Sequence, residues 1–284
     1  MDPQGPPAHS LTPAPPRRVG RDGHLRLAFA RRGDRTVLTR SGFTLPLQVM
    51  APVGLDDSAA VVSVLNPTGG LVGGDRLVID VEVGPEAHAC LTTPSATKVY
   101  RASGSAAVQE VRLRLGAGAA LEWVPDHTIP FAASAFRQSV DVELGAGARL
   151  ILVDAFAAGR VARGEAWRFA LLESALRIRD GGGWLLIDRF RLTGDARWAG
   201  LGGTEDAAYF ATVVVLGDVD VDALARRVMG RLGTSVAVGR LARRGALLRC
   251  LVPDAPALAR SVDALWSLAR RALFGLAPLA LRKG

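Results

Sequence analysis

Residues 111–121 read Val-Arg-Leu-Arg-Leu-Gly-Ala-Gly-Ala-Ala-Leu, and residues 140–150 repeat the pattern as Val-Asp-Val-Glu-Leu-Gly-Ala-Gly-Ala-Arg-Leu. In both stretches apolar and charged side chains alternate up to the first glycine. This alternation is typical of a strand with one buried and one solvated face. The glycine-rich turn then leads into a second apolar run, so each stretch predicts a strand, a turn and a second strand.

Related units lie before and after this pair. Residues 79–91 alternate in the same way around Gly84-Pro85-Glu86-Ala87, and residues 176–187 form a looser copy around Gly181–Gly183. The first glycines of the three regular turns are 32 and then 29 residues apart. A unit that recurs at such a spacing indicates stacked hairpins in a layered or solenoid-like β-structure. An ordinary β-sandwich is the alternative, and the pattern alone does not separate the two.

The last quarter of the chain changes to a helical pattern. Asp220 can cap a helix over residues 219–233, and Asp254 can cap a longer one over residues 254–275 that ends at Gly275. Two short strands, 235–238 and 246–252, are expected between them. The fold class predicted is therefore mainly β with two helices in the C-terminal part.

We expect one folded domain. Residues 1–22 are rich in proline and have no apolar core, so we expect a disordered tail rather than a signal peptide. Residues 23–284 contain no strong linker and are expected to form a single β-rich domain. The longest apolar run, Ala207–Leu216, is too short to cross a bilayer and predicts a buried strand.

Composition narrows the class of protein. The formal charge is +8, but the arginines are scattered and few aromatic residues lie among them. An acidic protein partner therefore explains the surplus better than nucleic acid does. The two cysteines, Cys90 and Cys250, are too few for a disulfide framework or a paired-cysteine metal knuckle. We expect them to be reduced core thiols in a cytoplasmic protein that does not associate with membranes.

Known catalytic motifs do not account for the polar residues. The segment Asn66–Asp75 is rich in glycine but lacks the lysine and hydroxyl residue that end a phosphate-binding loop, so its glycines predict a sharp turn. Three carboxylates remain as candidates: Asp75, Asp154 and Asp188. From the pattern alone, Asp154 is a turn carboxylate at a strand end and Asp188 forms a simple salt bridge. Glycoside hydrolysis by a pair of these carboxylates is the natural enzyme hypothesis.

Five blocks of the sequence carry a family resemblance. They are residues 66–75 (NPTGGLVGGD), 91–101 (LTTPSATKVYR), 121–125 (LEWVP), 129–131 (IPF) and 159–165 (GRVARGE). Their order and spacing resemble the urease accessory protein family UreD, also called UreH. The resemblance extends from about Leu25 to the C-terminus.

The resemblance implies a scaffold rather than a catalyst. Members of this family have an elongated stack of sheets, similar to a β-helix, with a few helices. The family implies binding to the accessory protein UreF, which recruits the GTPase UreG, and docking on urease apoprotein during GTP-dependent nickel insertion. Nickel is expected to pass transiently through an internal tunnel, and no tightly bound cofactor is expected.

The resemblance also selects residues. Asp75, Asp154 and Asp188 correspond to acidic positions of the family, and Asp188 stands where the family commonly has a glutamate. Isolated carboxylates hold nickel weakly, as a conduit requires. A further set is marked by the motifs without an assigned role: Thr97, Lys98, Tyr100, Arg101, Arg160 and Glu165. Loop anchoring and ion pairing between layers are their expected uses.

Two other hypotheses stay open at this point. One is a β-solenoid enzyme that acts on a carbohydrate through Asp75, Asp154 or Asp188. The other is a purely structural adaptor that touches no metal.

Overall fold

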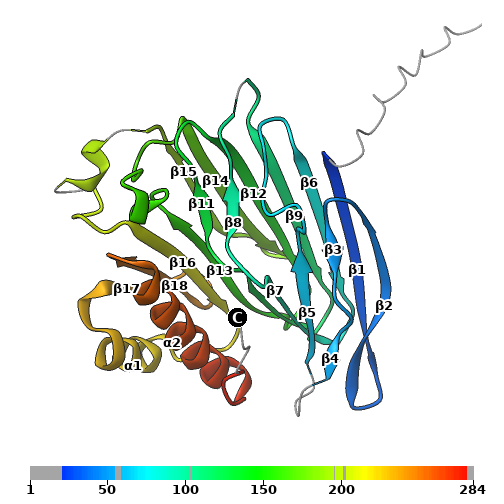
Figure 1. Ribbon diagram of the computed structural model, residues 1–284. Helices are drawn as coiled ribbons and strands as arrows, with labels where there is room; N and C mark the ends of the chain where they lie inside the picture. Colours follow the sequence, from blue (N-terminus) through cyan, green and yellow to red (C-terminus); the bar gives the residue numbers. More distant parts are fainter. Residues whose placement is uncertain (1–20, 55–58, 103, 195, 201–202, 280–284) are drawn as a thin grey trace, which may run out of the picture.

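In the computed structural model, two β-sheets lie face to face, and two helices pack against one of them (Figure 1). The structure describes residues 21–54, 59–102, 104–194, 196–200 and 203–279. The expected disordered tail lies outside the described residues up to position 20. We call the sheet without helices the open sheet and its partner the covered sheet.

Each sheet draws its strands from many parts of the chain. In spatial order the open sheet contains β15 (Gly183–Leu192), β14 (Leu171–Asp180), β12 (Ala135–Leu144), β9 (Ala107–Leu115), β6 (Arg76–Val83), β1 (Asp22–Arg32) and β2 (Arg35–Thr44). The main path of the covered sheet contains β17 (Val236–Arg240), β18 (Ala246–Val252), β16 (Tyr209–Leu216), β13 (Arg149–Ala157), β10 (Ala120–Val124), β7 (His88–Thr92), β5 (Ala60–Leu65) and β3 (Gln48–Val49). Short strands at its side are β4 (Val53–Gly54), β8 (Thr97–Val99) and β11 (Thr128–Pro130).

The chain crosses from one sheet to the other in every regular unit. The pairs β6–β7, β9–β10 and β12–β13 each place their first strand in the open sheet and their second in the covered sheet. Strands of successive units then pair in parallel, as β6 does with β9 and β7 with β10. Antiparallel hairpins of a sandwich would not give this pairing. The stacked, β-helix-like architecture is therefore confirmed.

The glycine turns of successive units stack on one another. Gly116 N–H donates to the carbonyl of Val83 at 2.8 Å, and Gly145 N–H donates to the carbonyl of Leu115 at 2.7 Å. A Cβ atom on Gly145 would lie 2.7 Å from the backbone nitrogen of Ala117. Glycine is required at this position because the turn of the preceding coil occupies the space that a side chain would need.

The fourth unit departs from the prediction. Strands β14 and β15 form an antiparallel hairpin inside the open sheet, with Asp180 opposite Gly183, and do not cross to the covered sheet. Gly183 adopts a φ of +104°, which allows the tight reversal. β15 thereby becomes the edge of the open sheet, and Trp184 and Ile187 are exposed on it.

The C-terminal elements confirm the helices and strands expected there. Asp220 caps α1 (Val221–Leu232) and Asp254 caps α2 (Ala255–Phe274), each through a side-chain oxygen that accepts a backbone N–H. Strands β17 and β18 lie between the two helices in the chain. Short 3₁₀ turns occupy Val161–Arg163, Ala196–Ala199 and Gly233–Ser235. Among the described residues, no helix is both long enough and apolar enough to span a membrane.

A buried carboxylate joins α2 to the covered sheet. Glu122 of β10 accepts from the Trp266 indole at 2.6 Å and from Arg270 Nε at 2.8 Å, and its other oxygen lies 2.8 Å from His88 Nε2. Glu122 and Arg270 have almost no exposed surface. This cluster fixes α2 across the strands, and Arg270 also donates to the carbonyl of Ala277 beyond the helix.

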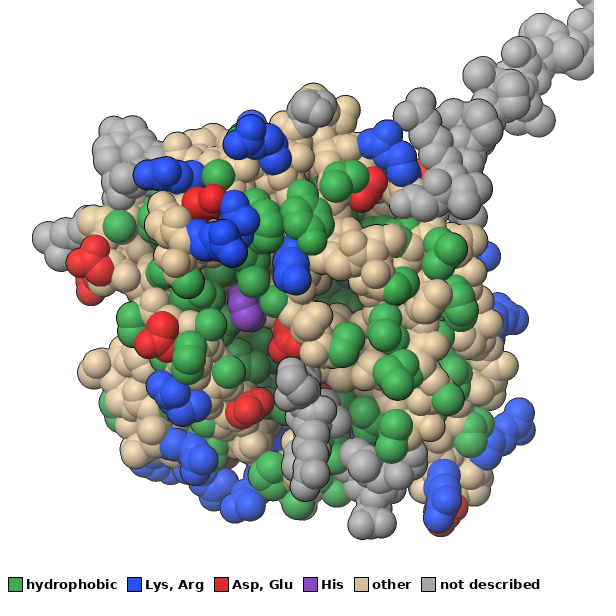
Figure 2. Space-filling view, in the orientation of Figure 1, with side chains coloured by type: hydrophobic (Ala, Val, Ile, Leu, Met, Phe, Trp, Pro, Cys, Tyr) green, Lys and Arg blue, Asp and Glu red, His purple; other side chains and the backbone are tan. Residues whose placement is uncertain are grey.

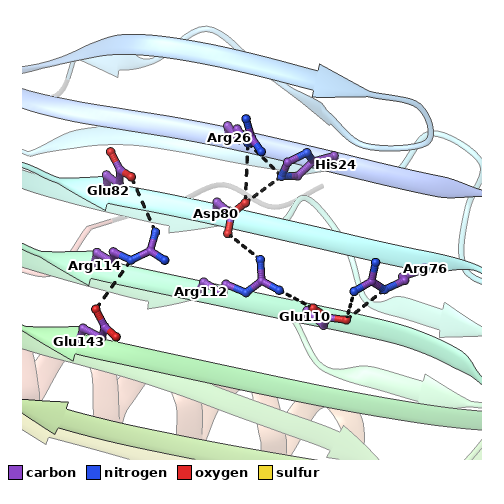
Figure 3. A network of polar contacts seen from close by, with 9 residues as sticks. All are labelled: His24, Arg26, Arg76, Asp80, Glu82, Glu110, Arg112, Arg114 and Glu143. Atoms are coloured by element: carbon purple, nitrogen blue, oxygen red, sulfur yellow. Dashed lines mark hydrogen bonds and ion pairs between the residues drawn. The ribbon is translucent and has the colours of Figure 1, made fainter. Parts of the chain in front are cut away.

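The outer face of the open sheet carries a network of ion pairs across its central strands (Figure 3). Arg112 of β9 bridges Glu110 at 2.7 Å and Asp80 of β6 at 3.4 Å. Arg114 lies 3.7 Å from both Glu82 and Glu143, on the strands at either side. Exposed pairs of this kind add little stability individually, but they keep a broad sheet face solvated.

Candidate functional site

A band of polar side chains crosses the otherwise apolar space between the sheets. On the open sheet Gln138 lies in register with Gln109 and Ser174, and on the covered sheet Asp154 lies in register with Thr212, which is in register with Arg249. We call these six residues the polar layer.

Hydrogen bonds connect the two halves of the polar layer. The Gln138 amide donates to Asp154 Oδ1 at 2.8 Å, and the Ser174 hydroxyl donates to Asp154 Oδ2 at 3.1 Å. Gln109 donates to the Gln138 carbonyl oxygen at 3.1 Å. Arg249 Nη1 lies 3.5 Å from Thr212 Oγ1. Asp154 is thus held by neutral donors from the opposite sheet.

Apolar layers enclose the polar layer on both sides. Toward the glycine turns, the next inward positions are aliphatic and buried: Val111, Val140, Leu152, Leu176 and Val214. On the other side, Phe156 packs against Phe190 and Phe210 with ring centroids 5.2 and 5.4 Å apart. Strand β15 departs from this order, because Phe190 lies in register with Ser174 and Asp188 lies in register with Leu176.

The prediction that Asp154 is a surface turn carboxylate is wrong. β13 does not end at Val153 but continues to Ala157, because residues 155–157 pair with β16 and are buried. Burial raises the pKa of Asp154 to about 6 from 3.8; the hydrogen bonds from Gln138 and Ser174 oppose this rise, and the negative charge of Asp188 adds to it. The carboxylate therefore changes charge close to neutral pH.

A cavity of about 300 Å³ adjoins one part of the polar layer. Gln109, Gln138 and Asp154 line it together with Thr97 and Lys98 of β8. Its lining also includes the exposed residues Pro67, Pro94 and Ser95. The cavity therefore leads from Asp154 toward the surface loops that carry the family-like motifs.

Asp188 lies near the opposite end of the polar layer, at the edge of the open sheet. Its carboxylate accepts from Arg249 Nη2 at 2.7 Å. The sequence predicted a salt bridge for Asp188, with Arg189 as its neighbour, but Arg189 pairs with Glu173 across β14 and β15. Adjacent side chains of a strand point to opposite faces, so Asp188 turns inward while Arg189 turns outward.

Asp75 has a different environment from the other two aspartates. Its Oδ2 accepts the backbone N–H of Val72 at 2.8 Å, and its Oδ1 lies 3.5 Å from Arg21 Nε. The side chain is buried, but it is not among the residues that line the cavity. The structure places Asp188 beside the Arg249 end of the polar layer that contains Asp154, close enough for its charge to act on Asp154, and leaves Asp75 inside its own loop.

A second hollow continues from the cavity along α2. It has a volume of about 600 Å³ and shares Pro94–Ala96, Pro125, Asp126 and Ala155 with the cavity. Leu258, Val262 and Trp266 of α2 form its apolar wall. Figure 2 shows hydrophobic side chains around this hollow beside α2.

Comparison with known proteins identifies the family. The family model described as UreD urease accessory protein matches residues 21–283. The chain belongs to the UreD family.

Individual relatives agree over almost the whole length. A protein of Deinococcus radiodurans named "Urease accessory protein UreD" is 36% identical over 278 residues, which cover 96% of this chain and 98% of the relative. Proteins of the same name from Ralstonia nicotianae and Alkalilimnicola ehrlichii are 38% and 35% identical, over 97% and 96% of this chain. Their names describe urease accessory proteins, and membership of the UreD family supports a role in urease maturation for this chain.

Several residues marked by the UreD resemblance meet at the end of the coils away from the glycine turns. Tyr100 contacts the Phe131 ring edge-on, with centroids 5.0 Å apart, and the Arg160 guanidinium lies 4.3 Å from the centre of the same ring. Arg160 Nε donates to Glu165 Oε2 at 2.7 Å and thereby holds the pKa of Glu165 below its usual range. These residues bind one coil to the next.

The remaining marked residues lie beside this cluster. Thr97 and Lys98 use their backbones to hold β8 in place, through the carbonyl of His127 and the N–H of Leu71. Arg101 is exposed. No side chain of this set coincides with the polar layer, although Thr97 and Lys98 line the adjoining cavity.

Sequence reasoning missed Gln109, Gln138 and Ser174. Each lies seven positions before the first glycine of its turn, at Gly116, Gly145 and Gly181, and occupies an inward position of its strand. A polar residue at the same inward position in three successive units was the available signal. Across the described ranges, no group of three or more histidine, cysteine, aspartate or glutamate side chains is placed to hold a metal ion.

Proposed function

We propose that this UreD-family chain is a non-catalytic scaffold that binds urease apoprotein and the partners UreF and UreG in the cytoplasm. In this role it assists the GTP-dependent insertion of nickel into the urease active site. We further propose that nickel crosses the chain through the cavity and the polar layer, by way of Asp154 and Asp188. The observation that carries this path is the desolvated Asp154 carboxylate, which lies between the sheets and lines the cavity.

The chemistry of Asp154 supports a transient site for a cation. A carboxylate enclosed by apolar layers is unfavourable when it is charged, and a cation beside it removes that penalty. Its present partners, Gln138 and Ser174, are neutral. A Ni²⁺ ion that arrives from the cavity therefore gains an anionic ligand, and amide and hydroxyl oxygens lie nearby.

The donor set also favours release. Nickel prefers imidazole and thiolate ligands, and oxygen ligands hold it more weakly. Each stop of a conduit must bind the ion loosely enough for the next stop to take it. We place Asp75 outside this path, because its carboxylate braces the loop that contains Val72.

The carbohydrate-enzyme hypothesis gains no support from the geometry. Glycoside hydrolysis needs two carboxylates that flank one bond of the substrate. Here Asp75 and Asp188 each lie against an arginine, Arg21 and Arg249 respectively. The structural-adaptor hypothesis remains the useful competitor, since it predicts the same complexes without a metal path.

Co-purification and activation together test the proposal. Tagged full-length chain is first expected to retain urease apoprotein, UreF and UreG. The variants Asp154→Asn and Asp188→Asn keep side-chain size but remove the anionic charge from the path. We expect normal complexes and a urease activity after nickel addition that falls by about tenfold, because each lost anion weakens a carboxylate–metal contact.

The control is Asp141→Asn, which removes a carboxylate from the outer face of the open sheet, where Asp141 pairs with Arg177 at 2.7 Å. This variant should activate urease normally. Full urease activation by both Asp154→Asn and Asp188→Asn would contradict the metal path and favour the structural-adaptor hypothesis. Failure of the unaltered chain to retain urease would sink the scaffold role.

A further inference from the structure

Arg249 occupies the end of the polar layer where a cation would leave it. Its guanidinium lies 2.7 Å from Asp188 Oδ1, and its Nη1 lies 3.5 Å from Thr212 Oγ1. The Arg249 side chain is 52% exposed, whereas that of Asp188 is 19% exposed. The arginine therefore reaches from solvent to cover the carboxylate closest to the edge of the sheets.

The two carboxylates of the proposed path differ in their charge environment. Asp154 accepts hydrogen bonds from the neutral groups of Gln138 and Ser174, while Asp188 carries a permanent cation from Arg249. An arginine side chain stays protonated at any pH at which the protein is folded. Within the part of the chain that the structure describes, the hydrogen-bond partners of Asp154 are neutral, whereas a metal ion must displace a guanidinium at Asp188.

We propose that Arg249 is a tethered competitor that displaces the metal ion from Asp188 and so speeds its release from that carboxylate. Because Arg249 is fixed to β18, its guanidinium returns to the carboxylate at a high effective concentration after each displacement. The displaced ion is then free to pass to solvent or to a docked acceptor. This inference rests on the proposed metal path through Asp154 and Asp188.

The two possible roles of Arg249 predict opposite effects of its removal on metal affinity. If Arg249 competes with the metal, its removal strengthens metal binding and slows release. If Arg249 only stabilises the edge of the sheets, its removal leaves metal binding unchanged or weakens it. Arg249 is a positioning residue in this scheme, since it acts on the ion through Asp188.

The test is calorimetric titration of the purified full-length chain with Ni²⁺, followed by stopped-flow transfer of the bound ion to a chelator. For Arg249→Met we expect binding about fivefold tighter, which corresponds to ~1 kcal/mol, the upper range for a partly exposed ion pair. Transfer to the chelator should slow by a similar factor. Arg249→Lys should behave like the unaltered chain, because it keeps a tethered cation.

Two further variants test whether any gain in nickel affinity is specific to Arg249 and depends on Asp188. Arg177→Met removes an arginine that pairs with Asp141 on the outer face, also at 2.7 Å, and should leave nickel affinity unchanged. Adding Asp188→Asn to Arg249→Met should cancel the gain. If Arg249→Met melts early, Arg249→Gln serves in its place, since it retains a polar group at the edge.

Unchanged or weaker nickel binding by Arg249→Met overturns the role of Arg249. If Asp154→Asn and Asp188→Asn still weaken binding in that experiment, the metal path survives alone. If neither aspartate variant changes nickel binding, both the proposed metal path and the proposed role of Arg249 are wrong.

Discussion

At the scale of single residues, Asp154 shows how position in a sheet changes the chemistry of a carboxylate. The same residue type on the outer face, Asp80, lies among arginine and histidine side chains. Asp154 faces the opposite sheet, and burial raises its pKa to about 6. The folded state therefore holds a proton that the unfolded chain has already released between pH 3.8 and about 6.

This difference predicts how stability depends on pH. Because the folded state binds more protons over that window, the Asp154 contribution to the unfolding free energy falls as pH rises. Asp154→Asn removes this contribution. We expect the unfolding free energy of the variant to equal that of the unaltered chain near pH 4. At pH 7.5 we expect it to be higher than that of the unaltered chain by up to about 3 kcal/mol.

Urea unfolding at the two pH values measures this effect. Asp141→Asn, on the outer face, is the control and should show no gain at pH 7.5. If Asp154→Asn is less stable than the unaltered chain at both pH values, the charged Asp154 carboxylate does not destabilise the folded state.

At the scale of elements, α2 depends on one buried ion pair. Glu122 receives hydrogen bonds from Trp266 and Arg270, and both charged partners have almost no exposed surface. Replacing Glu122 by Gln leaves the Arg270 guanidinium buried without this counter-charge. We expect a loss of about 3–5 kcal/mol in unfolding free energy, measured by urea unfolding.

The exposed pair Asp222–Arg240 provides the matched control for that variant. Its side chains are 73% and 59% exposed, so Asp222→Asn should change stability by less than about 1 kcal/mol. Equal losses in the two variants would show that α2 does not depend on the buried pair.

At the scale of the whole molecule, the coils are held in contact by their glycine turns. A Cβ atom at Gly145 would press on the backbone of the preceding turn, whereas one at Gly181 would meet no atom within 4 Å. Gly181 belongs to the hairpin that does not cross between the sheets. The two glycines therefore distinguish stacked turns from an edge turn.

We expect Gly145→Ala to lower the unfolding free energy by about 1–3 kcal/mol, because the added atom forces adjacent turns apart. Gly181→Ala should be neutral or slightly stabilising, since it only restricts the unfolded chain. Thermal unfolding of both variants measures the difference. A neutral Gly145→Ala variant would contradict the tight stacking of the turns.

Much of this architecture was predictable from neighbouring residues. Alternation such as that in residues 111–115 predicts a strand, and Asp220 and Asp254 predict the starts of α1 and α2. The looser unit at residues 176–187 misled the prediction, because a strand, turn and strand look alike whether the second strand crosses to another sheet or returns within its own. Local sequence contains no information on that choice.

By itself, the sequence determined the repeated units, the capped helices and the family, because each depends on residues that are close together or on motifs with fixed order. Only the tertiary structure decided which polar residues meet. Asp154 and Gln138 are 16 positions apart and Asp188 and Arg249 are 61 apart, and they come into contact because stacking and sheet pairing bring distant strands to one level. The polar layer is thus a property of the packed sheets, where desolvation of Asp154 raises the pKa of its carboxylate.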